Sequence, residues 1–160
     1  EYLIWKGSQF GRLFQSKPSY LERKHPKSGE IYKYWRWQSS TSPILGKWQK
    51  YFYPNSAKQI PQDLEKILTE PISLAIWYMD DGYYSLKDKS SYIYLGRVSK
   101  NEALIAQKAI ENNFDIKSKV YDKKKKGFAL FFSVSETKKL HSKLMEHMHP
   151  SMNYKTSLTP

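Results

Sequence analysis

Residues 74–82 read Leu-Ala-Ile-Trp-Tyr-Met-Asp-Asp-Gly, an apolar run that ends in two aspartates and a glycine. A helix that is apolar on all sides belongs in a core or against another helix. Upstream, Thr69 suits an N-cap and Pro71 a first-turn position, and Gly82 is placed to end the helix as its C-terminal cap. We therefore predict a buried helix that starts near Pro71 and ends at Gly82.

The two aspartates are physically awkward at this place. The helix dipole is negative at the C-terminal end, and burial raises the pKa of a carboxyl group unless a cation compensates. A bound Mg²⁺ supplies that compensation, because hard cations prefer oxygen ligands. The alternative is that Asp80 and Asp81 are exposed at a fraying helix end, and an Asp-Asp-Gly sequence without further context favours that alternative.

The flanking sequence predicts an α+β protein in which helices alternate with pairs of strands. After the helix that ends at Gly82 we expect two strands, a helix, two strands and a helix, over residues 83–88, 91–99, 101–113, 116–122, 128–134 and 136–148. Before that helix we expect a helix, a two-stranded hairpin and a short helix, over residues 1–14, 20–24, 30–40 and 44–53. The elements of residues 1–53 therefore look like those from residue 70 onward, with the opening helix and the first two strands missing.

The charge balance points to a polyanionic partner. The 160 residues include 27 Lys and Arg against 15 Asp and Glu, which gives a net charge of +12. Most of these cations lie in strand-like and turn-like stretches rather than on an amphipathic helix, which favours nucleic acid over a membrane surface. No apolar run approaches the ~20 residues that span a bilayer. Cysteine is absent, which excludes disulfides and thiolate metal sites.

Residues 74–82 resemble the signature of the LAGLIDADG homing endonucleases. The opening Leu-Ala pair, the final acid Asp81 and the terminal Gly82 match, whereas Ile76 replaces a glycine and Met79 replaces the first aspartate. The likeness extends to three segments that are similar to the two-motif, intron-encoded branch of the family: Phe-Tyr-Pro at 52–54, Lys-Gln-Ile-Pro at 58–61 and Met-Asn-Tyr-Lys at 152–155.

The resemblance implies the LAGLIDADG homing-endonuclease fold, in which two αββαββα halves form a saddle and each sheet lies in the major groove of DNA. Residues 69–160 would be a complete second lobe, residues 55–68 a linker, and residues 1–54 an incomplete first lobe (α-β-β-α). A catalytic pair in this family takes one acid from each of two helices, and the chain contains one motif. We therefore expect a second polypeptide to carry the first motif, in a split or nicked enzyme that reassembles as a heterodimer.

The activity that the resemblance implies is hydrolysis of both strands of a specific double-stranded DNA site. It would use Mg²⁺ or Mn²⁺ and no organic cofactor, with Asp81 as a shared metal ligand beside Gly82. Lys58 and Lys155 match basic residues near the scissile phosphates, where they can orient water or stabilise developing charge. Either residue can also be an ordinary surface lysine.

Alternate side chains along each predicted strand form one face of the sheet, and such a face can contact DNA bases, since Arg or Lys suits guanine and Gln suits adenine. A register error of one residue would turn every side chain to the other face. The Lys-Lys-Lys-Lys-Gly turn is expected to clamp phosphates rather than read bases, unless it is a solvated loop. The candidate nucleic-acid contacts are Tyr34, Arg36, Gln38, Arg97, Lys117, Lys119, Tyr121, Lys123, Lys124 and Lys125.

The main rival function is that of a non-catalytic nucleic-acid-binding protein, such as an intron RNA maturase or a structural RNA or DNA binder. A maturase would keep its function after Asp81→Asn, whereas an endonuclease would lose cleavage and keep its DNA affinity. A membrane-surface protein is a more distant alternative, and we expect no membrane partner. The intron-encoded habit of the family implies an intracellular, organellar location, in a mitochondrion or plastid.

Overall fold

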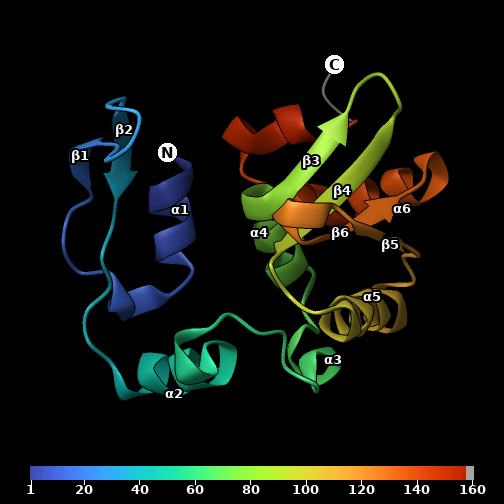
Figure 1. Ribbon diagram of the computed structural model, residues 1–160, viewed down its shortest axis with the longest axis horizontal. Coiled ribbons are helices and arrows are strands. Elements are labelled where there is room, and N and C mark those ends of the chain that lie inside the picture. The colour runs from blue at the N-terminus through green and yellow to red at the C-terminus, as the bar shows by residue number, and fades with distance from the viewer. Residues whose placement is uncertain (158–160) are drawn as a thin grey trace. The chain divides into compact units, whose positions relative to one another are not determined.

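The computed structural model in Figure 1 describes residues 1–157, and the chain divides into two compact units, Glu1–Lys47 and Trp48–Pro160. Each unit contains helices and an antiparallel sheet, so the predicted α+β class is confirmed. Within residues 1–157, no helix combines the length and the apolar character that crossing a bilayer would need.

The first unit is built on the predicted hairpin. Its elements are α1 (Tyr2–Ser8), the 3-10 turn η1 (Gly11–Leu13), β1 (Ser19–Lys24), β2 (Ile31–Arg36) and the start of α2 (Pro43–Phe52). The two strands pair antiparallel, with Ser19 opposite Arg36. The Trp37 ring packs against α1 at Gly7, so closely that a Cβ on Gly7 would lie 2.4 Å from the ring. The indole N–H of Trp37 donates to the Ser16 carbonyl at 2.6 Å.

The second unit has the predicted order of helix, two strands, helix, two strands and helix. Those elements are α4 (Pro71–Asp81), β3 (Gly82–Ser85), β4 (Ser90–Gly96), α5 (Lys100–Phe114), β5 (Lys119–Asp122), β6 (Phe128–Phe132) and α6 (Val134–Leu144). Short helical turns complete the unit: η2 (Pro54–Ser56), α3 (Leu64–Ile67), η3 (Lys124–Lys126), η4 (Met145–His147) and η5 (Pro150–Lys155).

The four strands form one antiparallel sheet in the order β3-β4-β6-β5. Ile93, Leu130 and Val120 are directly opposite one another across β4, β6 and β5, so they share a face. Helices α4, α5 and α6 contact the sheet, and Ile93 and Leu130 are fully buried on the core side. The other face of the sheet therefore carries the side chains of the alternate residues, which include Tyr92, Tyr94 and Tyr121.

The start of α4 differs from the prediction and its end agrees with it. The N-cap is Glu70 rather than Thr69, and it makes no side-chain cap, because Pro71 begins the helix directly. Gly82 ends the helix as predicted, in an extended conformation (φ −82°, ψ 152°). The reason is that Gly82 is already the first residue of β3 and pairs with Ile93.

The expected linker is partly packed. Within residues 55–68, the side chains of Ile60, Leu64 and Leu68 are buried, and α3 contacts α5. The amide side chain of Asn113 on α5 donates to the carbonyls of Glu65 and Leu68, both at 2.7 Å. Apolar burial and these hydrogen bonds together hold the segment leading into α4 against the second unit.

Candidate metal and nucleic-acid site

Helix α4 buries only one of its sides. Leu74, Ala75, Tyr78 and Met79 are buried, whereas Ile72, Ile76 and Trp77 are partly exposed and Asp80 and Asp81 are exposed. The predicted burial of this helix is therefore confirmed for one side of α4, whereas an apolar stripe along its other side remains open. Asp81 lies at the C-terminal end of that stripe.

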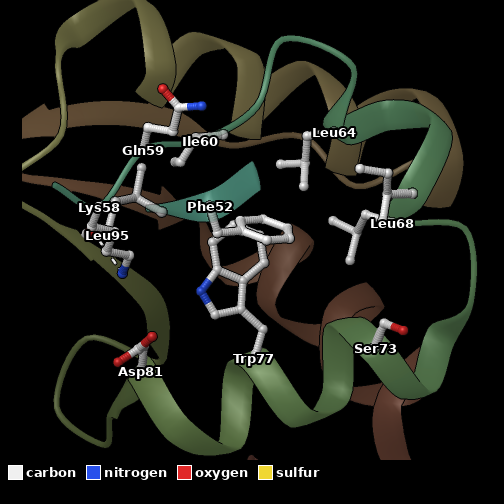
Figure 2. A pocket seen from close by; sticks show the side chains of 11 residues that line it. Phe52, Lys58, Gln59, Ile60, Leu64, Leu68, Ser73, Trp77, Asp81 and Leu95 are labelled. Carbon is white, nitrogen blue, oxygen red and sulfur yellow. Dashed lines mark hydrogen bonds between the residues drawn. The ribbon is translucent and has the colours of Figure 1, made fainter. Parts of the chain in front are cut away.

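A cavity of about 360 Å³ lies beside the open stripe of α4 (Figure 2). Trp77 and Asp81 line it from α4, Phe52 and Lys58 from the preceding segment, and Leu95 from β4. The Lys58 ammonium donates to the Leu95 carbonyl at 3.4 Å. The structure thus brings the predicted residues Asp81 and Lys58 to the wall of one mostly apolar cavity.

Lys155 lies at the end of α4. Its ammonium donates to the carbonyl of Met79 at 2.7 Å and to that of Asp80 at 3.4 Å. These carbonyls belong to the last turn, where intrahelical donors run out, and a cation there also complements the helix dipole. Burial lowers the pKa of Lys155, while the charges of Asp80 and Asp81 raise it. A second predicted residue is therefore held beside Asp81, where it also caps the helix.

A buried polar network beneath α4 was missed by the sequence analysis. The backbone N–H of Ser157 donates to Nδ1 of His141 at 2.9 Å, so Nδ1 is the unprotonated nitrogen and Nε2 carries the hydrogen. Nε2 lies 2.9 Å from the Tyr78 hydroxyl and 3.1 Å from that of Ser91, and the Tyr78 hydroxyl donates to the Lys155 carbonyl at 2.7 Å. The network ties α4 to the segment that carries Lys155.

A sequence signal for this network did exist. His141 lies four residues after Thr137 and three before Leu144, on the same side of α6, and all three residues are buried.

Burial raises the pKa of the Tyr78 hydroxyl well above its usual range and lowers that of His141 to about 4. Both groups are therefore neutral at physiological pH.

We expect His141 to make the second unit sensitive to acid. The unfolded chain binds a proton on His141 below its usual pKa of 6.5, whereas the folded protein binds it only below about 4. The stability that the neutral histidine contributes is thus present above pH 6.5 and is lost as the pH falls toward 4, by at most about 3 kcal/mol. Urea unfolding at several pH values measures this slope. His141→Asn should flatten it, and an unchanged slope would contradict the assignment.

The candidate contacts of the second unit lie in different settings. Lys119 and Tyr121 are on the sheet face that the helices leave uncovered, and the Lys123 ammonium lies 4.3 Å from the centre of the Tyr92 ring. Lys124, Lys125 and Arg97 are exposed, the first two in the η3 turn and Arg97 just after β4.

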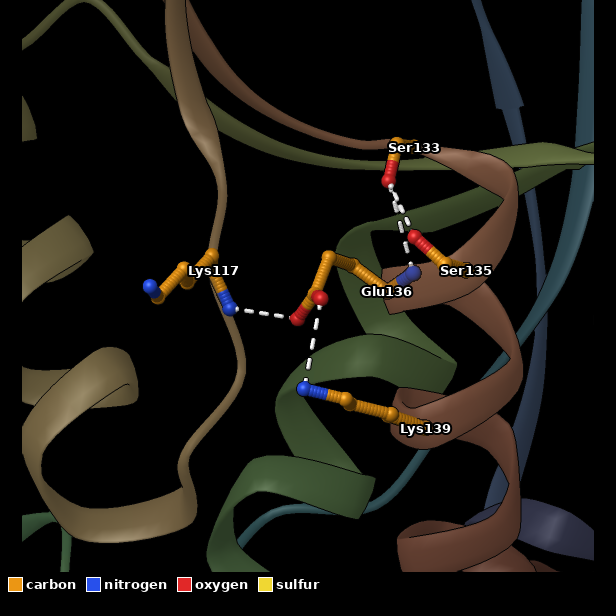
Figure 3. A network of polar contacts seen from close by, with 5 residues as sticks. All are labelled: Lys117, Ser133, Ser135, Glu136 and Lys139. Carbon is orange, nitrogen blue, oxygen red and sulfur yellow. Dashed lines mark hydrogen bonds and ion pairs between the residues drawn. The ribbon is translucent and has the colours of Figure 1, made fainter.

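Lys117 is not part of a strand, because β5 begins at Lys119. Its backbone N–H donates to the Glu136 carboxylate at 2.7 Å, and the same carboxylate lies 3.3 Å from the Lys139 ammonium, so Glu136 ties the start of α6 to this loop (Figure 3). The Lys117 side chain is exposed and points away from Glu136.

Two of the candidate contacts of the first unit, Tyr34 and Arg36, share one face of β2. Trp35 lines a cavity of about 450 Å³ together with residues of α1. Since side chains alternate along a strand, Tyr34 and Arg36 lie on the opposite face of β2, away from α1. Gln38 follows the strand, and its amide oxygen accepts from the Arg36 guanidinium at 3.1 Å.

A complete metal site is not formed by the side chains of residues 1–157: no three His, Asp or Glu side chains come together there as potential ligands. Asp81 offers an exposed carboxylate, which is the donor type that hard divalent cations prefer. Gly82, the other predicted residue, is buried, and its N–H donates to the Tyr78 carbonyl to close the helix. The Asp81 carboxylate therefore fits one ligand position of the shared metal site that the family resemblance implies.

Comparisons with known proteins identify the family and the fold of the chain. The model of the LAGLIDADG DNA endonuclease family matches residues 1–140. The solved structure titled "The homing endonuclease I-WcaI bound to its DNA recognition sequence" has a similar fold, with a TM-score of 0.87 over 99% of this chain and 72% of that chain, at 24% identity.

Curated relatives include a maturase and an endonuclease. The cytochrome b mRNA maturase bI2 of Debaryomyces hansenii is 26% identical over 84% of this chain and 51% of its own length. Protein RecA of Mycobacterium shimoidei is 25% identical over 97% of this chain and 37% of its own length. The probable intron-encoded DNA endonuclease 3 of Mycosarcoma maydis is 25% identical over 79% of this chain and 95% of its own length. The chain thus spans about half or less of the first two relatives.

Proposed function

The chain belongs to the LAGLIDADG DNA endonuclease family, and we propose from this premise that it forms part of an enzyme that hydrolyses both strands of a specific double-stranded DNA site. The observation that carries the proposal is the exposed carboxylate of Asp81. It lies at the end of the family motif helix, beside the ammonium group that Lys155 holds against the last carbonyls of α4. This location separates Asp81 from an ordinary surface aspartate.

Asp81 would hold Mg²⁺ or Mn²⁺ together with oxygen ligands from water, DNA and a second acid. When bound, such an ion activates the attacking water and stabilises the leaving oxygen. No organic cofactor is part of the proposal.

Lys58 and Lys155 have separate supporting roles in the proposal. The Lys155 ammonium is fixed by two carbonyl oxygens, so its charge is preorganised near the phosphate that Asp81 would face. Lys58 is exposed and has one carbonyl contact at 3.4 Å, which leaves its side chain able to follow a phosphate. Both lysines would stabilise negative charge that develops during cleavage.

The open stripe of α4 would receive a second motif helix, which supplies the other acid. Ile72, Ile76 and Trp77 on α4 offer apolar contacts, and the neighbouring cavity of about 360 Å³ is lined mainly by apolar side chains. Burying this stripe against a helix would remove apolar surface from water. We propose that a second polypeptide, carrying the first motif, supplies this helix in a heterodimer.

DNA contacts would come from both units. In the first unit, Tyr34 and Arg36 share a face of β2, and Gln38 contacts Arg36. In the second unit the proposed contacts are Arg97, Lys117, Lys119, Tyr121, Lys123, Lys124 and Lys125. The net charge of +12 favours binding to the DNA backbone, with an affinity that falls as salt rises.

A second candidate function is RNA binding without cleavage. The relative from Debaryomyces hansenii is a cytochrome b mRNA maturase, which supports this alternative. The likeness to intron-encoded proteins also supports an organellar location, in a mitochondrion or plastid.

The test begins with the native particle that contains this chain. We expect its mass and peptide sequences to reveal a second motif helix that ends in an acid. A library of random double-stranded DNA is then incubated with the particle, once with Mg²⁺ and once with a chelator, and cut ends are sequenced. Site-specific ends that need the metal support the endonuclease. A particle with both acids that binds DNA and cuts none of it would move the assignment to the RNA-binding alternative.

A further inference from the structure

The lysine beside Asp81 is attached to α4 at both of its ends. Its side-chain end is the ammonium group of Lys155, which donates to the carbonyls of Met79 and Asp80. Its backbone end is the Lys155 carbonyl, which accepts a hydrogen bond from the Tyr78 hydroxyl at 2.7 Å. Three consecutive residues in the last turn of α4 therefore fix both ends of one lysine.

The Tyr78 hydroxyl is itself oriented by a buried histidine. Nε2 of His141 carries the ring hydrogen and lies 2.9 Å from that hydroxyl, which can accept from His141 while it donates to Lys155. Nδ1 of His141 accepts from the N–H of Ser157, two residues beyond Lys155. Tyr78 and His141 are fully buried, so bulk water does not compete for these hydrogen bonds.

The short segment between these two attachment points is also fixed. Thr156 is buried, and both its hydroxyl and its backbone N–H donate to the Asn153 carbonyl, each at 2.9 Å. Lys155 is the last residue of the η5 turn, which ends at these hydrogen bonds. A shift of the Lys155 backbone away from α4 would therefore break its hydrogen bond with Tyr78.

A polar network is a demanding way to fill this part of the core. Buried polar groups destabilise a fold unless each finds a partner, whereas apolar side chains of similar size pack without that requirement. A fully satisfied network does provide one fixed geometry, because hydrogen bonds are directional. The pairing of Tyr78 with His141 thus needs an explanation beyond stability, and the group whose position it fixes is Lys155.

We propose that Tyr78 is a positioning residue for Lys155: its hydroxyl, oriented by His141, holds the ammonium group beside Asp81 for DNA cleavage. The inference rests on the proposed function, in which the charge of Lys155 acts on the phosphate at Asp81. It adds a buried group that touches neither DNA nor metal. Preorganised charge is effective because it need not be moved into place during the reaction, and a Lys155 with a mobile backbone would lose that advantage.

The first measurement reports the position of Lys155 without any cleavage. The native particle is treated briefly with acetic anhydride, and the acetylation of each lysine is read from peptide masses. Tyr78→Phe removes one hydroxyl and keeps the ring. It should speed the acetylation of Lys155 about fivefold, the factor that one hydrogen bond of typical strength represents. Lys138, an exposed lysine of α6, should react at its original rate.

Tyr84→Phe is the matched control variant. The Tyr84 ring lies 5.3 Å from the His141 ring, so the same hydroxyl is removed beside the same network, whereas the Lys155 carbonyl is held by Tyr78. This control should change neither the acetylation of Lys155 nor the cleavage rate. If the Tyr78→Phe chain does not fold, His141→Asn takes its place. That variant keeps the Tyr78 hydroxyl and removes the group that orients it, so the acetylation of Lys155 should rise again.

The second measurement is a double-mutant cycle on the cleavage rate. With saturating DNA, Tyr78→Phe should slow cleavage about fivefold, the same factor as above, and leave DNA affinity unchanged. In a chain that also carries Lys155→Met, Tyr78→Phe should slow cleavage no further. A residue that only stabilises the fold would slow cleavage by the same factor in both backgrounds.

The inference can fail separately from the endonuclease. Unchanged acetylation of Lys155 in the Tyr78→Phe particle would overturn it, and so would an equal loss of cleavage in both backgrounds of the cycle. A particle in which only Lys155 becomes more reactive, and which never cuts DNA, supports the positioning of Lys155 and contradicts the endonuclease. A particle that cuts DNA, and whose Lys155 reactivity does not depend on Tyr78, does the reverse.

Discussion

Asp81→Asn is expected to lower DNA cleavage by about a thousandfold or more, the scale on which preorganised charged groups act in catalysis. The amide is nearly isosteric with the carboxylate, but it cannot supply the negative charge that a divalent cation needs. DNA affinity in a chelator should be retained or slightly raised, because one negative charge near the phosphates is removed. The measurement is cleavage of the selected site by the native particle, with a gel shift of the same DNA.

Asp115→Asn is the matched control for this prediction. Asp115 is exposed, lies in the same unit, and has the left-handed conformation (φ 55°) that Asn also tolerates, so the fold should not change. Its cleavage rate should equal that of the original protein. If Asp81→Asn cuts DNA as fast as this control does, Asp81 does not bind the catalytic metal.

Gly82→Ala is expected to destabilise the second unit by about 3 kcal/mol or more, in the range of the most disruptive single substitutions. A Cβ at this position would lie 2.2 Å from the Tyr78 carbonyl oxygen and 2.5 Å from its ring. Neither neighbour can move easily, because that carbonyl accepts the N–H of Gly82 and the Tyr78 side chain is fully buried. Urea unfolding followed by circular dichroism measures the loss.

Gly46→Ala is the corresponding control. Gly46 lies within α2, and a Cβ there meets no atom within 4 Å. Alanine should be neutral or stabilise that helix, by up to about 1 kcal/mol, since it is the better helix former. A Gly82→Ala protein that unfolds at the same urea concentration as the original would show that the end of α4 adjusts, contrary to the contacts around Tyr78.

Local patterns were sufficient to predict the order of elements. Each hairpin of the second unit is marked by a turn between two strand-like runs, and α5 begins at a capping box formed by Ser99 and Glu102. Alternation also places Lys119 and Tyr121 on one face of β5, as the structure has them. These features depend on neighbours in the sequence and need no information on how the chain folds back on itself.

Contacts between distant residues could not be predicted in this way. Gly82 is extended because it pairs with Ile93, and Lys155 reaches the end of α4 although it lies 76 positions after Met79 in the sequence. His141 is neutral because it is buried, and its ring nitrogens contact Tyr78, Ser91 and Ser157. None of these partners is adjacent in the sequence.

The sequence by itself determined the family, the α+β class, the order of helices and strands in the second unit, and the acid at the end of the motif helix. Local periodicity and the motif residues carry that information. Only the tertiary structure decided which side of α4 stays open, which lysine caps it, and which tyrosines form the uncovered face of the sheet. Burial and long-range hydrogen bonding depend on the whole packed unit, so no single stretch of sequence encodes them.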